Sequence, residues 1–282
     1  MPKVFLLKKY IKIYQNISKP IILKWWVFFC FLFVLQSSIK LLIMEILNTT
    51  GKNITKSELL LVTKPIGALI IASTLDLDQF TTESIEVFVE RLTGNIQITN
   101  GVMSLKDFIL LTTFNGDAVT SDANYKTTAE CEIAENGAIA LNEKDVIKIK
   151  LSGLKTAEAY LLNTIEMPQT TEKVLQFDNR SMNGDERQKA FDVYDCDLAL
   201  LDNSDTIEEV SYTFINDVVV RYTLHELRVL SRSVDPVGYI KQDGTVKSSF
   251  TGKLQLPLIG VKNIEIRKSQ GAIVNLLTRN EA

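Results

Sequence analysis

The sequence has very few of the side chains that most often do chemistry. His225 is the only histidine among 282 residues, and three cysteines are present, Cys30, Cys131 and Cys196. A catalytic histidine needs a nucleophile and an orienting acid, and no motif supplies them. The sequence contains no Gly-rich phosphate loop, no HExxH motif and no CxxC pair. We therefore expect no enzyme activity and no cofactor, with His225 solvated or capping a helix.

The cysteines and tryptophans are equally uninformative about a site. Cys131 and Cys196 stand alone on strand-like stretches, where a small buried hydrophobe is the expected role, and a disulfide between them stays open. No tryptophan follows Trp26, although aromatic platforms usually carry sugar contacts. Metal binding by His and Cys is excluded by their number.

Positive charge is scarce outside the N-terminus. Residues 1–43 contain seven lysines and no acid, which leaves 24 basic and 34 acidic side chains in the remainder, a net charge of −10. Phosphate neutralisation needs clustered Lys and Arg, so we expect no direct sequence-specific nucleic-acid binding.

The N-terminal segment, residues 1–43, is basic and hydrophobic and is predicted to form a helix. Its apolar run between Lys24 and Lys40 is short for a membrane span, but Pro20 to Ile43 could cross with both lysines snorkelling. A cleaved signal peptide is a second reading, although Gln36 and Ser38 make a poor cleavage site. A third is that the protein starts at Met44, with the preceding codons translated in frame.

The rest of the chain has the pattern of an all-β protein. Short alternating or apolar runs such as "SIEVFVE" (84–90) and "DVIKIKLSG" (145–153) are separated by turn residues such as Asn136-Gly137. Evenly spaced strands over more than 200 residues favour sandwiches or barrels over α/β layers.

Four pairs of segments repeat in the same order. "SIEVFVE" matches "TIEEVSY" (206–212), "SLKDFILL" (104–111) matches "TLHELRVL" (223–230), "GAIAL" (137–141) matches "GKLQL" (252–256), and "IKI" (147–149) matches "IEI" (264–266). Colinear matches at spacings of 115 to 122 residues favour an internal duplication. Each unit offers about eight strands and one short helix, so we predict two tandem eight-stranded jelly-roll sandwiches. The expected divisions are an arm at 44–57, jelly roll 1 at 58–168 and jelly roll 2 at 169–282.

The two short helices have matching features. Ser104 and Thr223 stand where N-caps belong, each with an acid three residues later. One face of each helix is apolar and is predicted to cover the open end of its sandwich; its residues are Leu105, Phe108 and Leu111 in the first helix and Leu224, Leu227 and Leu230 in the second.

An acidic stretch, "FDVYDCDLALLDNSD" (191–205), gives the one weak metal candidate. Asp195 and Asp197 share one face of a strand and could offer oxygen ligands to Ca²⁺. The spacing matches no calcium loop, and an edge strand that uses charge against aggregation explains it as well.

Glu58 to Ala282 resembles the double jelly-roll major capsid proteins of icosahedral viruses. The resemblance rests on length, the duplication and the "IEVFVERLTGNIQ…SLKDFILL" type of segment in each half, and it is strongest to the compact versions in membrane-containing bacteriophages, the corticovirus group and a lipid-containing phage of flavobacteria. It implies a structural subunit of the virion capsid, with homotrimers of pseudo-hexagonal outline tiling a shell, and with neighbouring capsomers, an internal membrane and vertex proteins as partners. The alternative is a membrane-anchored, extracytoplasmic tandem β-sandwich that binds a glycan or a protein.

Overall fold

The strands of the chain form two sandwiches with the same order of strands. The computed structural model describes residues 43–113, 119–171, 173–233, 238–240, 246–248 and 253–281. The predicted N-terminal helix lies outside the described residues. Within these residues, no helix is long and apolar enough to cross a membrane.

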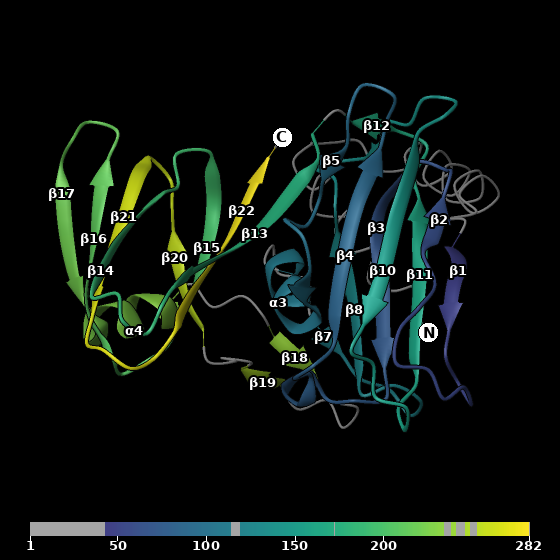
Figure 1. Ribbon diagram of the computed structural model, residues 1–282, viewed down its shortest axis with the longest axis horizontal. Helices are drawn as coiled ribbons and strands as arrows, with labels where there is room; N and C mark the ends of the chain where they lie inside the picture. Colours follow the sequence, from purple (N-terminus) through teal and green to yellow (C-terminus); the bar gives the residue numbers. More distant parts are fainter. Residues whose placement is uncertain are drawn as a thin grey trace, which may run out of the picture. The chain divides into compact units, whose positions relative to one another are not determined.

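The first sandwich has two sheets, shown in purple to teal in Figure 1. One sheet has the order β1-β11-β3-β8, with β1 (Ile43–Asn48), β11 (Tyr160–Glu166), β3 (Ile66–Ser73) and β8 (Thr127–Glu132). The other has the order β2-β10-β4-β5, with β2 (Leu60–Val62), β10 (Val146–Ser152), β4 (Ser84–Glu90) and β5 (Ile96–Gln97). Neighbours in both orders pair antiparallel.

Short strands extend this framework. β6 (Met103–Ser104) pairs with β4, and β7 (Val119–Thr120) extends the first sheet beyond β8 to β18 (Gly238–Ile240) and β19 (Val246–Ser248). β9 (Ala138–Ile139) and β12 (Thr170–Thr171) pair in parallel, and a 3₁₀ turn spans Leu77–Gln79.

The second sandwich repeats the same arrangement. One sheet has the order β13-β22-β15-β20, with β13 (Leu175–Met182), β22 (Val274–Glu281), β15 (Cys196–Asp202) and β20 (Lys253–Pro257). The other has the order β14-β21-β16-β17, with β14 (Gln188–Asp192), β21 (Val261–Lys268), β16 (Ile207–Phe214) and β17 (Val219–Thr223). Eight framework strands in each sandwich, in the same order, confirm the predicted all-β fold of two tandem jelly rolls.

The sheet orders also decide which repeat matches are correct. β4 ("SIEVFVE") pairs with β10 ("IKI"), and β16 ("TIEEVSY") pairs with β21 ("IEI"), so these matches lie on equivalent strands. The match of "GAIAL" with "GKLQL" is wrong, because "GAIAL" contains β9 and "GKLQL" contains β20, whose counterpart in the sheet order is β8. Short apolar runs look alike in any strand, and their pairing partner is not encoded in them.

The segment expected as an arm contributes a full strand. Met44 and Leu47 of β1 lie opposite Thr164 and Leu162 of β11. The first strand of the first jelly roll therefore begins at Ile43. All of the described residues belong to one compact unit of the chain, Leu42–Ala282.

The strands follow from the alternation of their residues. In β4 the side chains of Ile85, Val87 and Val89 are fully buried while the residues between them are not, as expected of a strand with one face in the core. In β21, Ile264 and Ile266 show the same alternation. Register is therefore set by the apolar face.

Both predicted N-caps are confirmed. Helix α3 (Leu105–Thr112) follows Ser104, whose hydroxyl accepts from the Asp107 amide at 3.5 Å. Helix α4 (Leu224–Ser233) follows Thr223, whose hydroxyl accepts from the Glu226 amide at 3.4 Å, and the Glu226 carboxylate accepts from the Thr223 amide at 2.7 Å. The second helix therefore begins with a reciprocal capping box, and the first has the single Ser104 contact.

Replacing Thr223 with alanine is expected to lower the free energy of unfolding by about 1 kcal/mol, because loss of the threonine hydroxyl leaves the Glu226 amide without its acceptor. Ser104→Ala is expected to cost less, about 0.5 kcal/mol, because its single contact is longer. Urea unfolding of both variants measures this difference. A Ser104→Ala variant that lost more stability than Thr223→Ala would contradict it.

Candidate functional site

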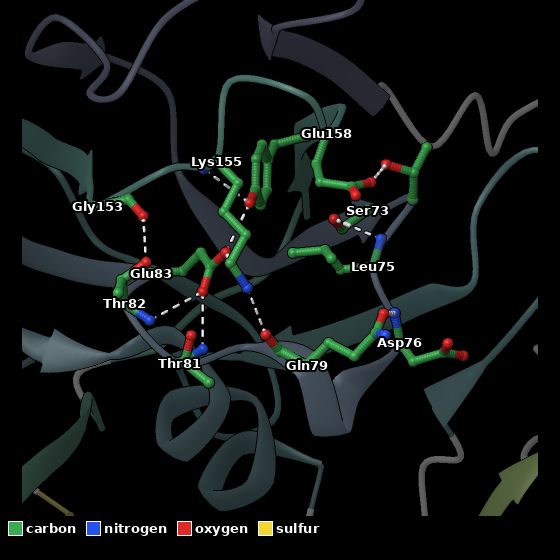
Figure 2. A network of polar contacts seen from close by, with 12 residues as sticks. Ser73, Leu75, Asp76, Gln79, Thr81, Thr82, Glu83, Gly153, Lys155 and Glu158 are labelled. Atoms are coloured by element: carbon green, nitrogen blue, oxygen red, sulfur yellow. Dashed lines mark hydrogen bonds and ion pairs between the residues drawn. The ribbon is translucent and has the colours of Figure 1, made fainter.

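A buried carboxylate organises one end of the first sandwich. The Glu83 side chain is fully buried, and its Oε2 accepts from the amides of Thr81 at 2.9 Å and Thr82 at 3.1 Å. Its Oε1 accepts from the Tyr160 hydroxyl at 2.8 Å, and the Lys155 ammonium lies 3.5 Å away. Figure 2 shows Glu83 at the centre of this group, with Lys155 reaching in from the opposite loop. The four donors satisfy a charge that would be costly to bury alone.

The pKa values of Glu83 and Tyr160 are both shifted further away from pH 7. Burial acts to raise the pKa of Glu83, but the hydrogen bonds from Tyr160 and from the backbone amides outweigh it and lower the pKa. Burial, together with the Glu83 carboxylate, raises the pKa of Tyr160. A general acid or base works best with a pKa near the working pH, and neither group has one. The network is suited to holding three loops together rather than to proton transfer.

Close backbone contact locks the same loops. Gly153 has φ +68°, and a Cβ there would lie 2.0 Å from the carbonyl oxygen of Thr82. The Thr82 hydroxyl donates to the Gly153 carbonyl at 2.8 Å, as Figure 2 shows. Glycine is required here both for its positive φ and for this approach. No local motif links residues 81–83 with 153–160, so the sequence alone does not predict this network.

A cavity of about 310 Å³ lies next to this network, and its lining includes Thr49, Lys52, Thr74 and Glu158. The Thr74 hydroxyl donates to the Glu158 carboxylate at 2.5 Å, and the Lys52 ammonium donates to the carbonyl of Asn48 at 2.7 Å. Among the described residues, no aromatic side chain lines the cavity, so this part of the chain offers no stacking platform of the kind typical of a sugar site.

The two candidate metal ligands, Asp195 and Asp197, differ in their surroundings. Asp197 forms a two-oxygen ion pair with Arg279, a residue 4% exposed, through contacts of 3.1 Å from Nε to each carboxylate oxygen. Asp195 is exposed in the turn before β15 and belongs to no such pair. Within the described part of the chain, no group of three His, Cys, Asp or Glu side chains could hold a metal ion. The Asp197 carboxylate is thus engaged by a guanidinium, and metal binding at Asp195 and Asp197 stays a prediction.

His225 and the two described cysteines have ordinary surroundings. His225 is exposed on α4 beside Glu226. Cys131 is fully buried in the first core, where burial raises its pKa to about 12. Cys196 is half-buried with its pKa also raised by burial, and both are free thiols. Thiols held protonated in this way are poor nucleophiles.

The apolar helix residues differ between the two helices. Leu105, Phe108 and Leu111 of α3 are fully buried in the first core. In α4, Leu227 is buried and Leu224 is half-buried, whereas Leu230 is 44% exposed. Leu230 therefore does not complete a buried face as predicted.

Most side chains of helix α3 are buried, because the helix packs between the two jelly rolls. It contacts β4, β6 and β8 of the first jelly roll and β22 of the second. The rings of Phe108 and Phe177 meet edge to face, with centroids 5.3 Å apart. Ile109 and Leu110 are buried as well, so the buried surface of α3 extends beyond the predicted face. Helix α3 thus takes part in a junction as well as contacting both sheets of its own jelly roll, and its role in covering the open end of the sandwich stays a prediction.

The second jelly roll supplies part of the first core. Leu198 and Leu200 of β15 and Leu277 of β22 belong to the same apolar cluster as the α3 residues. Their neighbours Ala199, Leu201 and Leu276 belong to the core of the second jelly roll. The β13-β22-β15-β20 sheet is therefore apolar on both faces. We call its contact with α3 the α3 junction.

An ion-pair cluster borders the α3 junction. The Lys253 ammonium lies 2.6 Å from the carboxylate of Asp202 and 3.4 Å from that of Asp107 in α3, and the lysine side chain is 13% exposed. Asp202 also accepts from the amide nitrogen and the side chain of Asn275. The junction thus combines an apolar centre with a partly buried charged border.

The strand order defines the chain as a double jelly-roll protein. No family model matches it, and no curated protein matches it. Among solved structures, it is similar to the major capsid protein P2 from bacteriophage PM2, with 8% identity over 85% of this chain and 96% of that chain and a TM-score of 0.49.

Two further solved structures are similar over most of their length. The mavirus major capsid protein is 8% identical over 85% of this chain and 86% of that chain, with a TM-score of 0.32. The PBSX exported protein XepA is 11% identical over 86% of each chain, with a TM-score of 0.21. At these identities the likenesses concern the fold alone.

Proposed function

We propose that the protein is a structural subunit of a viral capsid that assembles through its own surfaces. The observation that carries the proposal is the α3 junction between two jelly rolls of the same strand order. A chain that packs one jelly roll against another can extend the same kind of contact to further copies. Three copies with two jelly rolls each would present six similar units around a ring, which is the pseudo-hexagonal homotrimer of the proposal.

The character of the polar groups supports a structural role. Glu83 and Tyr160 are locked in fixed protonation states, and Asp197 is engaged by Arg279. These groups stabilise loops and strands, as a subunit that functions through its shape requires. In this proposal the trimers tile an icosahedral shell over an internal membrane, with neighbouring capsomers and vertex proteins as partners and the virion as the location.

The full chain is expected to form a trimer in solution. Size-exclusion chromatography with light scattering should give three times the chain mass of 31.7 kDa. Electron microscopy of concentrated samples should show particles with a three-fold or six-fold outline. A chain that stays monomeric at every concentration would overturn the proposed function.

A further inference from the structure

The turns at one end of the second jelly roll carry exposed apolar side chains. Tyr194 lies in the turn between β14 and β15, Ile215 and Val218 lie in the turn between β16 and β17, and Ile259 lies in the turn between β20 and β21. Ile259 is 89% exposed, and the other three side chains are between 50% and 59% exposed. We call these four residues the apolar tip.

The three turns of the apolar tip lie side by side. The Ile215 amide donates to the carbonyl of Gly260 at 3.0 Å, which joins the second turn to the third. The Val193 amide donates to the carbonyl of Lys262 at 3.1 Å, which joins the first turn to the beginning of β21. Figure 1 shows the β16–β17 turn at the end of the second jelly roll away from α4. The apolar tip is therefore one surface built from three turns.

The first jelly roll exposes an apolar side chain in an equivalent turn. Leu92 lies between β4 and β5, the counterparts of β16 and β17, and is 82% exposed. Just after β5, Thr99 forms a parallel bridge with Phe177 of β13. In this bridge the Phe177 amide donates to the carbonyl of Ile98 at 2.7 Å, and the Asn100 amide donates to the carbonyl of Phe177 at 2.9 Å. The direction of one jelly roll is thus tied to that of the other.

The parallel bridge places Leu92 and the apolar tip at the same end of the protein. β5 directly follows the Leu92 turn and so runs away from it. β14 runs toward Tyr194 of the apolar tip and starts beside the end of β13, where the Lys189 ammonium donates to the carbonyl of Ser181 at 2.8 Å. β13 therefore runs away from the apolar tip. Since β5 and β13 run in parallel, both sets of turns lie at one end, which we call the tip end.

The chain also enters the first jelly roll at the tip end. β4 and β11 start together at the buried network, since the Tyr160 hydroxyl donates to the Glu83 carboxylate, and both strands run toward the tip end. β1 is antiparallel to β11, with Ile43 opposite Ile165, so β1 begins at the tip end. The basic and hydrophobic segment 1–43, for which a membrane anchor is one prediction, therefore ends where the apolar side chains are exposed.

We propose that the tip end, through the apolar tip and Leu92, contacts the surface of a lipid bilayer. Apolar side chains on separate turns can enter the headgroup region while the turns that carry them stay hydrated. Tyr194 has the aromatic body and polar hydroxyl that favour the interface between membrane and water. The inference rests on the proposed function, which includes an internal membrane as a partner, and it names the surface that faces this membrane.

The cations beside these turns are paired with acids. The Lys262 ammonium lies 3.3 Å from the carboxylate of Asp217, and the Arg91 guanidinium lies 3.5 Å from that of Asp145. We therefore expect the contact to depend on apolar side chains and to need no anionic lipid. Vesicles of phosphatidylcholine are the appropriate probe, because their lack of net charge avoids attraction of the seven lysines in residues 1–43.

A fluorescent label at one position of the full chain measures the contact directly. Ile259→Cys receives an environment-sensitive dye, and Ile273→Cys is the matched control, because Ile273 is an apolar turn residue, 61% exposed, at the opposite end of β21. Cys30 and Cys196 are replaced by serine in both variants, whereas Cys131 is fully buried. With vesicles, the dye at position 259 should shift to shorter wavelength and be quenched by spin-labelled lipid. The dye at position 273 should do neither.

Ile259→Asp and Leu92→Asp test the same surface in each jelly roll. Each substitution replaces an apolar side chain at the bilayer with a carboxylate, so we expect the partition coefficient onto vesicles to fall roughly tenfold. Ile273→Asp should leave it unchanged. The three positions are exposed, so these variants should unfold at the same urea concentration as the wild type. Leu92→Asp supplies the test in the event that Ile259→Asp fails to fold.

The possible outcomes separate this inference from the proposed function. Equal dye responses at positions 259 and 273, or a partition coefficient that Ile259→Asp and Leu92→Asp leave unchanged, would overturn the lipid contact alone. A dye at position 259 that shifts without vesicles as the chains associate would mean that the apolar tip binds a second copy, which also overturns it. A chain that stays monomeric yet inserts its tip would overturn the proposed function and keep the lipid contact.

Discussion

Phe108→Ala is expected to lower the free energy of unfolding by about 4 kcal/mol. The Phe108 side chain is fully buried, so the substitution removes a large apolar group and leaves a cavity in a close-packed core. It also removes the edge-to-face contact with Phe177, which contributes about 1 kcal/mol beyond area burial. Urea unfolding followed by tryptophan-independent signals, such as far-UV circular dichroism, measures the loss.

A conservative variant and a double-mutant cycle separate these two contributions. Phe108→Leu keeps most of the apolar volume and should cost about 1.5 kcal/mol. The cycle with Phe177→Ala should give a coupling of about 1 kcal/mol, because the two rings are in direct contact. A cost below 1 kcal/mol for Phe108→Ala would show that the α3 junction does not support the fold.

Glu83→Gln is expected to cost about 3 kcal/mol at pH 7. Glutamine has one acceptor oxygen in place of two, so its amide nitrogen would face either the Thr81 and Thr82 amides or the Tyr160 hydroxyl and Lys155. Donors left buried without an acceptor account for the loss. Glu90→Gln is a suitable control, because Glu90 forms an exposed ion pair with Lys148 and should cost less than about 1 kcal/mol.

The same substitution is expected to change the pH dependence of stability. The pKa of Glu83 is lowered in the folded state, so its carboxylate contributes stability above the ordinary value of 4.5. That contribution is lost as pH falls from about 4.5 through the lower folded-state pKa. Wild type should therefore lose more stability than Glu83→Gln over this range. Urea unfolding at successive pH values measures the stability of both proteins. An equal loss of stability in the two as pH falls would contradict the lowered pKa of Glu83.

The sequence predicted the fold where local pattern determines structure. Strands such as β4 and β21 alternate clearly, and Ser104 and Thr223 mark the helix starts with their own side chains. Both signals are complete within about eight residues of chain. The tandem jelly rolls could therefore be predicted from spacing and repetition alone.

Long-range contacts could not be predicted in this way. The Asp197–Arg279 pair joins residues 82 positions apart, and Glu83 meets Tyr160 across 77 positions. The burial of α3 depends on Leu200 and Leu277, which come from the other half of the chain. Ile109 and Leu110 of α3 are apolar although they lie outside the predicted face. These two residues were the only indication in the sequence of α3 that the helix is covered on more than one side.

The two apolar faces of the β13-β22-β15-β20 sheet have an evolutionary consequence. A duplication implies an ancestor with a single jelly roll, and such a subunit would have had no second half to cover its helix. If the α3 junction is the older contact, it was first made between separate subunits and became internal when the genes fused. At the 119-residue spacing, Arg228 of α4 stands at the position that corresponds to Ile109 of α3, so the two halves now differ there. The chain would thus preserve within itself the subunit contact of its own ancestor.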